Sequence, residues 1–119
     1  MNLLDIFRDS DDLVEYPAGT VLFPEGASGE YMYVVVEGRV EITLHGKLLA
    51  DAGPGEMVGE MALINSEIRS ATATTITDCV LAYIDRTSFD SMLRHVPDFS
   101  IHVMNVLTER LQFAYERVD

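Results

Sequence analysis

Short apolar runs separated by turn residues occupy the chain from Leu13 to Asp85. Within this region Val40, Ile42 and Leu44 alternate with polar neighbours, which is the period of a half-buried strand. The dipeptide His45-Gly46 then marks a tight hairpin. The predicted strands are residues 13–16, 20–23, 31–37, 40–44, 47–52, 71–75 and 79–84. About eight strands at this spacing predict a mainly β fold with flanking helices, in the form of an eight-stranded jelly roll (a double-stranded β-helix).

The pattern becomes helical after Asp85. Thr87 and Asp90 have the spacing of a capping box, and Pro97 then interrupts the helix, so that Asp98 is expected to cap a second one. Near the start of the chain, residues 3–7 predict one short helical turn. We therefore expect a single domain over residues 1–119, with the barrel at about 13–85 and two C-terminal helices at about 86–118.

The last helix, expected over about residues 98–117, carries two apolar stripes. The first stripe contains Phe99, Val103, Val106 and Phe113, and the second contains Met104, Leu107, Leu111, Ala114 and Val118. Residues of the second stripe are spaced alternately by three and four, as in a short coiled-coil seam. Two interpretations remain open: a homodimer through this helix, which we favour, or a single wide face packed on the barrel.

Composition and charge exclude several classes of protein. Eight Lys and Arg residues face 20 Asp and Glu residues, which gives a net charge of −12. Such a surface repels a nucleic-acid duplex, so no nucleic acid is expected as a partner. No apolar run approaches the roughly 20 residues of a membrane span, and no signal peptide is visible. The single cysteine, Cys79, forms no internal disulfide and is expected to be a buried, inert thiol in a cytoplasmic protein.

The candidate chemistry lies between residues 59 and 71. Glu60 and Arg69 are nine positions apart, each next to small residues. A carboxylate accepts hydrogen bonds from hydroxyl groups, and a guanidinium binds phosphate through a planar fork of donors. Small neighbours allow backbone N–H groups to approach the same anion. A Glu and an Arg at this distance can also form a surface ion pair with no function.

Both segments of this region, Gly-Glu-Met-Ala-Leu at 59–63 and Arg-Ser-Ala at 69–71, resemble the phosphate-binding cassette of cyclic nucleotide-binding domains. That family includes bacterial catabolite activator proteins, the regulatory subunits of cyclic AMP-dependent kinase and cyclic nucleotide-gated channels. Residues 26–35 are similar to the family's upstream loop and apolar strand, and residues 38–42 to the Gly-x-Val that follows. The resemblance spans about residues 13–118.

The resemblance implies a role for each matching residue. Glu60 would accept the ribose 2′-hydroxyl group, and Arg69 would pair with the cyclic phosphate. Leu63 and Val58 are expected to wall the sugar. The full set of implied ligand-binding residues is Gly59, Glu60, Met61, Ala62, Leu63, Arg69, Ser70 and Ala71. In addition, the barrel interior is expected to be lined by Val34, Val36 and Thr72.

The base of the nucleotide is less well specified. A hydroxyl-bearing residue of the catabolite activator branch falls at Ala114, so that contact is missing. Tyr115 or Phe113 can instead stack on a purine, and Ser70 can meet a guanine amino group. We favour cAMP over cGMP as the ligand, mostly because cAMP is more frequent in the family.

The expected function is a non-catalytic sensor. His45, His95 and His102 are scattered and form no metal-binding motif, and His95 and His102 are expected to be solvated, so neither a metal nor an enzyme activity is predicted. The C-terminal helices would close as a lid, hinged near residues 95–97, and signal to an unknown protein effector. The alternative is a protein-interaction module with a degenerate, nucleotide-free pocket. The methionine at position 1 and the short segment before the first predicted strand favour a stand-alone binding protein over a domain excised from a longer chain.

Overall fold

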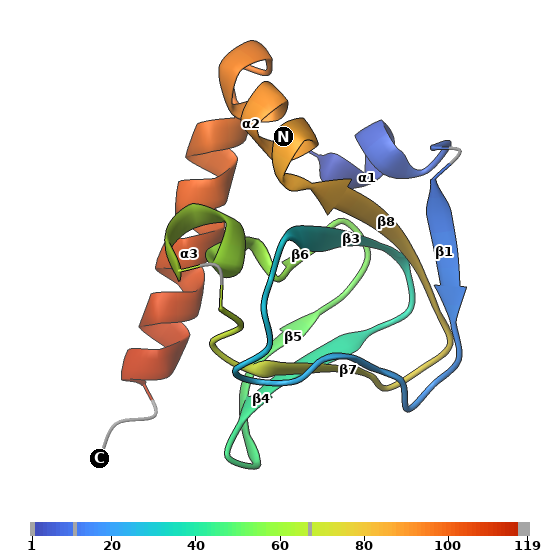
Figure 1. Cartoon of the computed structure of the whole chain (residues 1–119), viewed down its shortest axis with the longest axis vertical. Coiled ribbons are helices and arrows are strands. Elements are labelled where there is room, and N and C mark those ends of the chain that lie inside the picture. The colour runs from blue at the N-terminus through green and yellow to red at the C-terminus, as the bar shows by residue number, and fades with distance from the viewer. Residues whose placement is uncertain (1, 11, 67, 117–119) are drawn as a thin grey trace.

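The computed structural model describes residues 2–10, 12–66 and 68–116. Helices lie above the barrel of strands and along its left-hand side in Figure 1. Along the chain the elements are α1 (Leu3–Phe7), β1 (Leu13–Tyr16), β2 (Val21–Phe23), β3 (Tyr31–Glu37), β4 (Val40–Leu44), β5 (Lys47–Ala52), β6 (Met57–Val58), the π-helical turn η1 (Ala62–Ser66), β7 (Thr72–Thr75), β8 (Cys79–Asp85), α2 (Arg86–His95) and α3 (Phe99–Tyr115).

Eight strands form two four-stranded antiparallel sheets, which confirms the predicted jelly roll. One sheet has the order β1-β8-β3-β6, and the other has the order β2-β7-β4-β5. The predicted hairpin is present, because His45 and Gly46 both have positive φ angles, of 52° and 79°. Strand β6 was not among the predicted runs, since two residues are too few to show any period.

Strand β3 separates two cores, because both of its faces are buried. The helix-side core contains Leu3, Met32, Val34, Met57, Leu63, Ala82, Ile84, Phe89, Phe99 and Val103. The barrel core contains Phe23, Tyr33, Val35, Val40, Ala52, Val58, Ala73, Cys79 and Leu81. Cys79 is therefore a buried free thiol, as predicted.

The predicted barrel lining on β3 was wrong by one residue. Val34 and Val36 pack in the helix-side core, and Val35 faces the barrel interior. A strand covered on both faces has no polar alternation to reveal its phase. Thr72, the third residue expected in the lining, accepts a hydrogen bond from the Glu25 backbone N–H at 3.0 Å.

The helix starts differ from the predicted caps. Helix α2 follows β8 directly, and Asp85 is its N-cap, where the carboxylate accepts from the Ser88 backbone N–H at 2.8 Å. The predicted capping box at Thr87 is therefore wrong by two residues. Asp98 occupies the N-cap position of α3 but makes no side-chain capping hydrogen bond, so its predicted role is also wrong.

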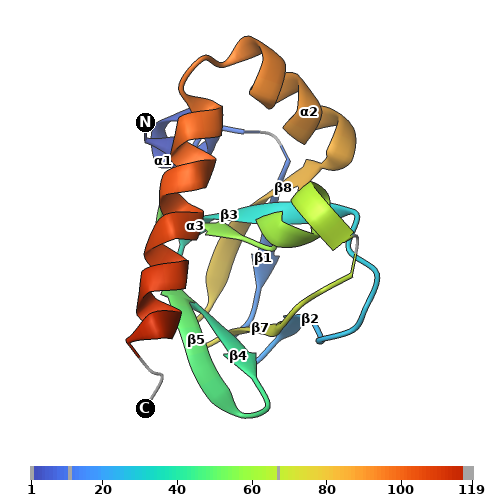
Figure 2. The same ribbon diagram turned by 90° about the vertical axis from the view of Figure 1, so that its left-hand side faces the viewer.

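Helix α3 runs along the side of the barrel next to β5 (Figure 2). Phe99 and Val103, both in the first stripe, are buried in the helix-side core. The residues of the second stripe differ in exposure: Leu107 is half-buried, while Met104 and Leu111 are exposed. Val118, its last predicted member, lies outside the described residues. One edge of α3 thus faces the barrel and another remains open to solvent.

Candidate functional site

A cavity of about 490 Å³ lies between α3, the β4–β5 hairpin and the segment that joins β6 to β7. This segment, residues 59–71, contains the turn at Gly59, the π-helical turn η1 and the return to β7, and we call it the cassette. The cavity is lined by Phe23, Ile42, Leu44, Leu49, Ala50, Gly59, Glu60, Met61, Ala62, Arg69, Ser70, Ala71, Leu107, Arg110, Leu111 and Ala114.

Gly59 allows the cassette to turn tightly under Arg69. Its φ angle is +86°, a backbone conformation that residues other than glycine rarely adopt. A β carbon at this position would lie 2.6 Å from Arg69 Nη1 and 3.2 Å from the Phe23 ring. The turn therefore brings the backbone so close to the guanidinium that only glycine fits.

Arg69 is the most deeply buried cation of the cavity, with 2% of its surface exposed. Its Nη1 donates to the Gly59 carbonyl oxygen at 2.9 Å, and its Nη2 donates to the Tyr31 carbonyl oxygen at 2.6 Å. The guanidinium carbon lies 4.0 Å from the centre of the Phe23 ring. Burial lowers the pKa of Arg69 from its ordinary value, against smaller opposing effects of Tyr31, Tyr33 and Glu60. An arginine keeps its charge under such conditions, so the site holds a fixed cation.

The Tyr31 ring also contacts Arg69, at 5.0 Å from the guanidinium carbon. The same ring stacks on Tyr83, with the ring centres 4.8 Å apart, and it meets Tyr33 edge-on at 5.5 Å. Tyr83 is 45% exposed, whereas Tyr33 is buried. A continuous series of aromatic rings therefore leads from the buried cation to the surface of the barrel.

The loop between β2 and β3 holds the cassette in place. The Gly26 N–H donates to the Arg69 carbonyl, and the Arg69 N–H donates to the Ala27 carbonyl, both at 2.8 Å. Gly29 lies beside them, and a β carbon there would come within 2.7 Å of Arg69 Nε and 2.6 Å of the Ala62 β carbon. The conformation of Arg69 thus depends on two glycines that are distant in sequence.

Glu60 is fully buried and faces the cavity. Its Oε1 accepts a hydrogen bond from Arg110 Nη1, on helix α3, and the two side chains form an ion pair. Arg110 Nη2 also donates to the Met57 carbonyl oxygen. Glu60 Oε2 is buried and has no hydrogen-bond partner among the residues that the structure describes. Since a buried carboxylate oxygen without a donor is unfavourable, this atom suits a hydroxyl group of a ligand.

Comparison with known proteins agrees with this arrangement. The sequence model of the cyclic nucleotide-binding domain matches residues 13–96. The chain belongs to the cyclic nucleotide-binding domain family. The domain is 32% identical over 104 residues to the CRP-like cAMP-activated global transcriptional regulator of Mycobacterium tuberculosis, which covers 83% of this chain and 46% of that protein.

Two solved structures resemble the domain closely. The catabolite activator protein of Thermus thermophilus is 33% identical with a TM-score of 0.75, over 86% of this chain and 50% of that one. The EAL enzyme Bd1971 in its cAMP-bound form is 30% identical with a TM-score of 0.65, over 87% of this chain and 29% of that one, and its cGMP-bound form matches similarly. The domain spans about half or less of the length of these relatives.

The structure brings most of the sequence-predicted residues of the domain together. Seven of them line the cavity: Gly59, Glu60, Met61, Ala62, Arg69, Ser70 and Ala71. Leu63, expected to wall the sugar, packs instead in the helix-side core, and Val58 packs in the barrel core. The π-helical turn η1 directs Leu63 away from the cavity, a rotation that the sequence does not reveal.

Sequence reasoning missed Phe23 and Arg110 as part of the site of this cyclic nucleotide-binding domain. Phe23 carries no local signal beyond its apolar strand. Arg110 interrupts the first apolar stripe of α3, between Val106 and Phe113, and a charge at that position was the available hint. Its partner Glu60 is 50 residues away, so only the fold pairs them.

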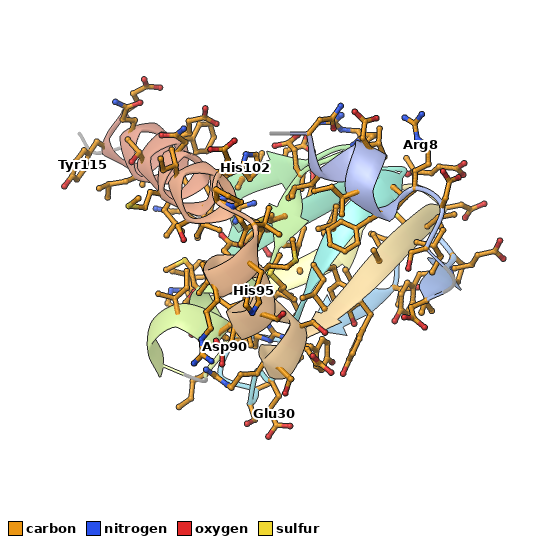
Figure 3. All side chains as sticks on the ribbon, turned by 90° about the horizontal axis from the view of Figure 1, so that it is seen from above. Arg8, Glu30, Asp90, His95, His102 and Tyr115 are labelled. Atoms are coloured by element: carbon orange, nitrogen blue, oxygen red, sulfur yellow. The ribbon has the colours of Figure 1, made fainter. Side chains whose placement is uncertain are left out.

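Metal binding finds no support in the described parts of the domain, where no cluster of His, Cys, Asp and Glu residues has a suitable geometry. His45 is exposed and lies 3.4 Å from Glu25. His102, expected to be solvated, is half-buried, and burial lowers its pKa. Figure 3 shows it on α3, apart from His95 on α2.

In residues 2–10, 12–66 and 68–116, no helix is long and apolar enough to cross a bilayer.

Proposed function

We propose that this domain is a non-catalytic, cytoplasmic sensor of 3′,5′-cyclic nucleotides. One observation carries the proposal: the orphaned oxygen of buried Glu60 and the buried guanidinium of Arg69 line the same cavity. A ribose 3′,5′-cyclic phosphate has a hydroxyl group and an anion on one rigid frame, which matches this pair. Residues 1–119 would act as one binding unit.

In the proposed complex the ribose hydroxyl group and the cyclic phosphate each have partners in the cassette. The 2′-hydroxyl donates to Glu60 Oε2, and the cyclic phosphate lies near Arg69. Backbone N–H groups at Ala62 and Ala71, together with the Ser70 hydroxyl, surround the phosphate, in the manner of anion sites at helix starts. cAMP is the first ligand to try, because the M. tuberculosis relative is named for it, and cGMP is the second, since Bd1971 was solved with both.

A titration tests the proposal. Calorimetry and thermal unfolding are followed with cAMP, cGMP and linear 5′-AMP. At a hundredfold excess over Kd a ligand stabilises the fold by about 2.7 kcal/mol, or roughly 10 °C for a domain of this size. Glu60→Gln should weaken binding by about tenfold, since it keeps a carbonyl acceptor but loses the charge. If neither cyclic nucleotide binds, the interaction module with a degenerate pocket becomes the better description.

We further propose that helix α3 acts as a lid. Leu107 and Leu111 line the cavity from α3, so a ligand adds apolar contacts to the helix, while Arg110 ties the helix to Glu60. Saturating nucleotide should therefore slow amide hydrogen exchange over residues 99–116 by about tenfold, since burial shifts the local opening equilibrium.

The lid has matched controls. Amides of the central strand β3 should show no comparable local change, because β3 already lies between two cores. Arg110→Met keeps an apolar stem but removes the ionic tie, and it should reduce the ligand-induced protection of α3. Exchange in α3 that does not respond to saturating ligand would show that the helix is no lid.

A homodimer through α3 is the proposed means of signalling to an effector. Ile101, Met104, Thr108, Leu111 and Tyr115 follow one another at alternating steps of three and four, and the four apolar members are exposed. Figure 3 shows Tyr115 at the far end of α3, away from the barrel. Such a seam suits a second copy of the same helix, and no nucleic acid or membrane is needed as a partner.

Sedimentation equilibrium tests the dimer. The unaltered chain should approach twice its mass of 13.2 kDa at high concentration. Met104→Glu should raise the dissociation constant of the dimer at least tenfold, because a charge would be buried in the seam. Val21→Glu, at another exposed apolar position on β2, is the control and should leave the mass unchanged. A monomer at all concentrations refutes this mode of signalling.

A further inference from the structure

Polar and apolar side chains divide the cavity into two ends. The polar end contains Glu60, Arg69, Ser70 and the cassette backbone, together with Arg110. The other end is formed by the β4–β5 hairpin and α3. Its side chains are all aliphatic, and they are Ile42, Leu44, Leu49, Ala50, Leu107, Leu111 and Ala114. A ligand whose cyclic phosphate and ribose occupy the polar end must place its base in the aliphatic end.

The aliphatic end provides faces for a flat ring and leaves the ring edge open to water. Leu111 is 52% exposed and Ala114 is also exposed, whereas Leu107 and the hairpin side chains are half-buried. A base between these walls stacks its faces on apolar side chains. In the single chain its polar edge points to the open rim, where water satisfies its donors and acceptors regardless of their order.

Building on the proposed function, we propose that the cavity recognises the ribose 3′,5′-cyclic phosphate and does not read the base. The ligand class is then cyclic mononucleotides in general, with purine and pyrimidine bases alike. Affinity follows the area of the ring that is buried, and not its pattern of hydrogen-bonding groups.

Two polar side chains of the cavity are near enough to be considered as readers of the base. The nitrogens Nη1 and Nη2 of Arg110 already donate, to Glu60 and to the Met57 carbonyl oxygen. Ser70 lies beside Arg69 at the phosphate end, and its hydroxyl contacts Met61 Sδ at 3.9 Å. Neither belongs to the aliphatic end. Strand β5 is the edge of its sheet, so its backbone is a further polar surface at that end among the described residues.

The expected selectivity follows from general behaviour of binding sites. A site that hydrogen-bonds a ligand group rejects an analogue lacking it by about 10⁴–10⁵-fold, whereas an apolar pocket rejects a polar isostere only by about a hundredfold or less. Because the polar edge of the base stays in water in this site, even that smaller penalty is reduced. We expect less than about tenfold in Kd between cAMP and cGMP, and between cCMP and cUMP. Purines should bind more tightly than pyrimidines by about ten- to a hundredfold, because the larger ring buries more area.

Calorimetric titration of the full chain with cAMP, cGMP, cCMP and cUMP is the test. Ratios below tenfold within the purine pair and within the pyrimidine pair support the inference. A ratio above tenfold in either pair overturns it and reveals a base contact, for example to the free edge of β5. Absence of binding by all four is a different result, because it refutes the proposed function itself.

Two variants test the inference without relying only on the affinity ratios of the unaltered chain. Ser70→Ala should change the cAMP-to-cGMP ratio by less than threefold, and a selective tenfold loss of cGMP would show that Ser70 reads guanine. Ala114→Asn places a hydrogen-bonding group at the aliphatic end and should raise the ratio within the purine pair to tenfold or more. Val21→Asn is the matched control on β2, outside the cavity, and should leave all four affinities unchanged.

Discussion

Arg69→Ala is expected to weaken cyclic nucleotide binding at least 30-fold. A charge-assisted hydrogen bond contributes roughly 1.5–3 kcal/mol, and Arg69 Nε, which has no partner among the described residues, can donate one to a phosphate. The same change leaves the carbonyl oxygens of Gly59 and Tyr31 without their donor and opens space beside Phe23. We therefore also expect the free energy of unfolding to fall by about 2–4 kcal/mol. Calorimetry and chemical denaturation measure the two effects separately.

Two further variants separate binding from folding at this position. Arg69→Lys keeps the charge but loses the planar fork, so binding should fall by about tenfold while the fold is less affected. Arg39→Ala removes a cation that pairs with Asp51 on the surface, outside the cavity, and should change affinity less than twofold. Unchanged affinity in Arg69→Ala would remove the phosphate role from this residue.

Gly59→Ala is expected to damage both the fold and the site. Holding alanine at a left-handed φ of +86° costs roughly 1–2 kcal/mol. Its β carbon would also lie 2.6 Å from Arg69 Nη1, and such overpacking adds about 1–3 kcal/mol. Since the contact displaces the guanidinium, nucleotide affinity should fall by at least 30-fold as well. Denaturant unfolding and calorimetry on the same sample measure the two quantities.

Gly19→Ala is the matched control for this variant. Gly19 has nearly the same φ, +84°, but a β carbon there meets no atom within 4 Å. It should therefore show only the backbone cost of about 1–2 kcal/mol and leave affinity unchanged. Equal losses of stability in the two variants, with binding intact in both, would mean that the clash with Arg69 is not important.

The sequence predicted the elements whose signal is local. The alternation at Val40, Ile42 and Leu44 placed β4, and the dipeptide His45-Gly46 placed the hairpin after it. The spacing of Glu60 and Arg69 also marked a single segment, and the structure lines one cavity with both. These features succeed because the residues that interact lie within one strand, one turn or one short loop.

Features that depend on distant contacts were not predicted. The pairing of Arg110 with Glu60 requires α3 to lie along β5, which no periodicity encodes. The interior face of β3 was assigned one residue out of phase, because helices cover its other face. Leu63 was placed in the site, although the π-helical turn carries it into the helix-side core. In each case tertiary packing decides between options that are equivalent locally.

The ring of Tyr31 gives this protein an intrinsic optical probe. The chain contains five tyrosines and no tryptophan, so its near-ultraviolet emission comes from tyrosine alone. Tyr31 contacts the guanidinium of Arg69 through both its ring and its carbonyl group, and Tyr83 stacks on it at the surface. An anion that docks on Arg69 changes the electric field at this stack, so occupancy can be followed by fluorescence without attaching any dye.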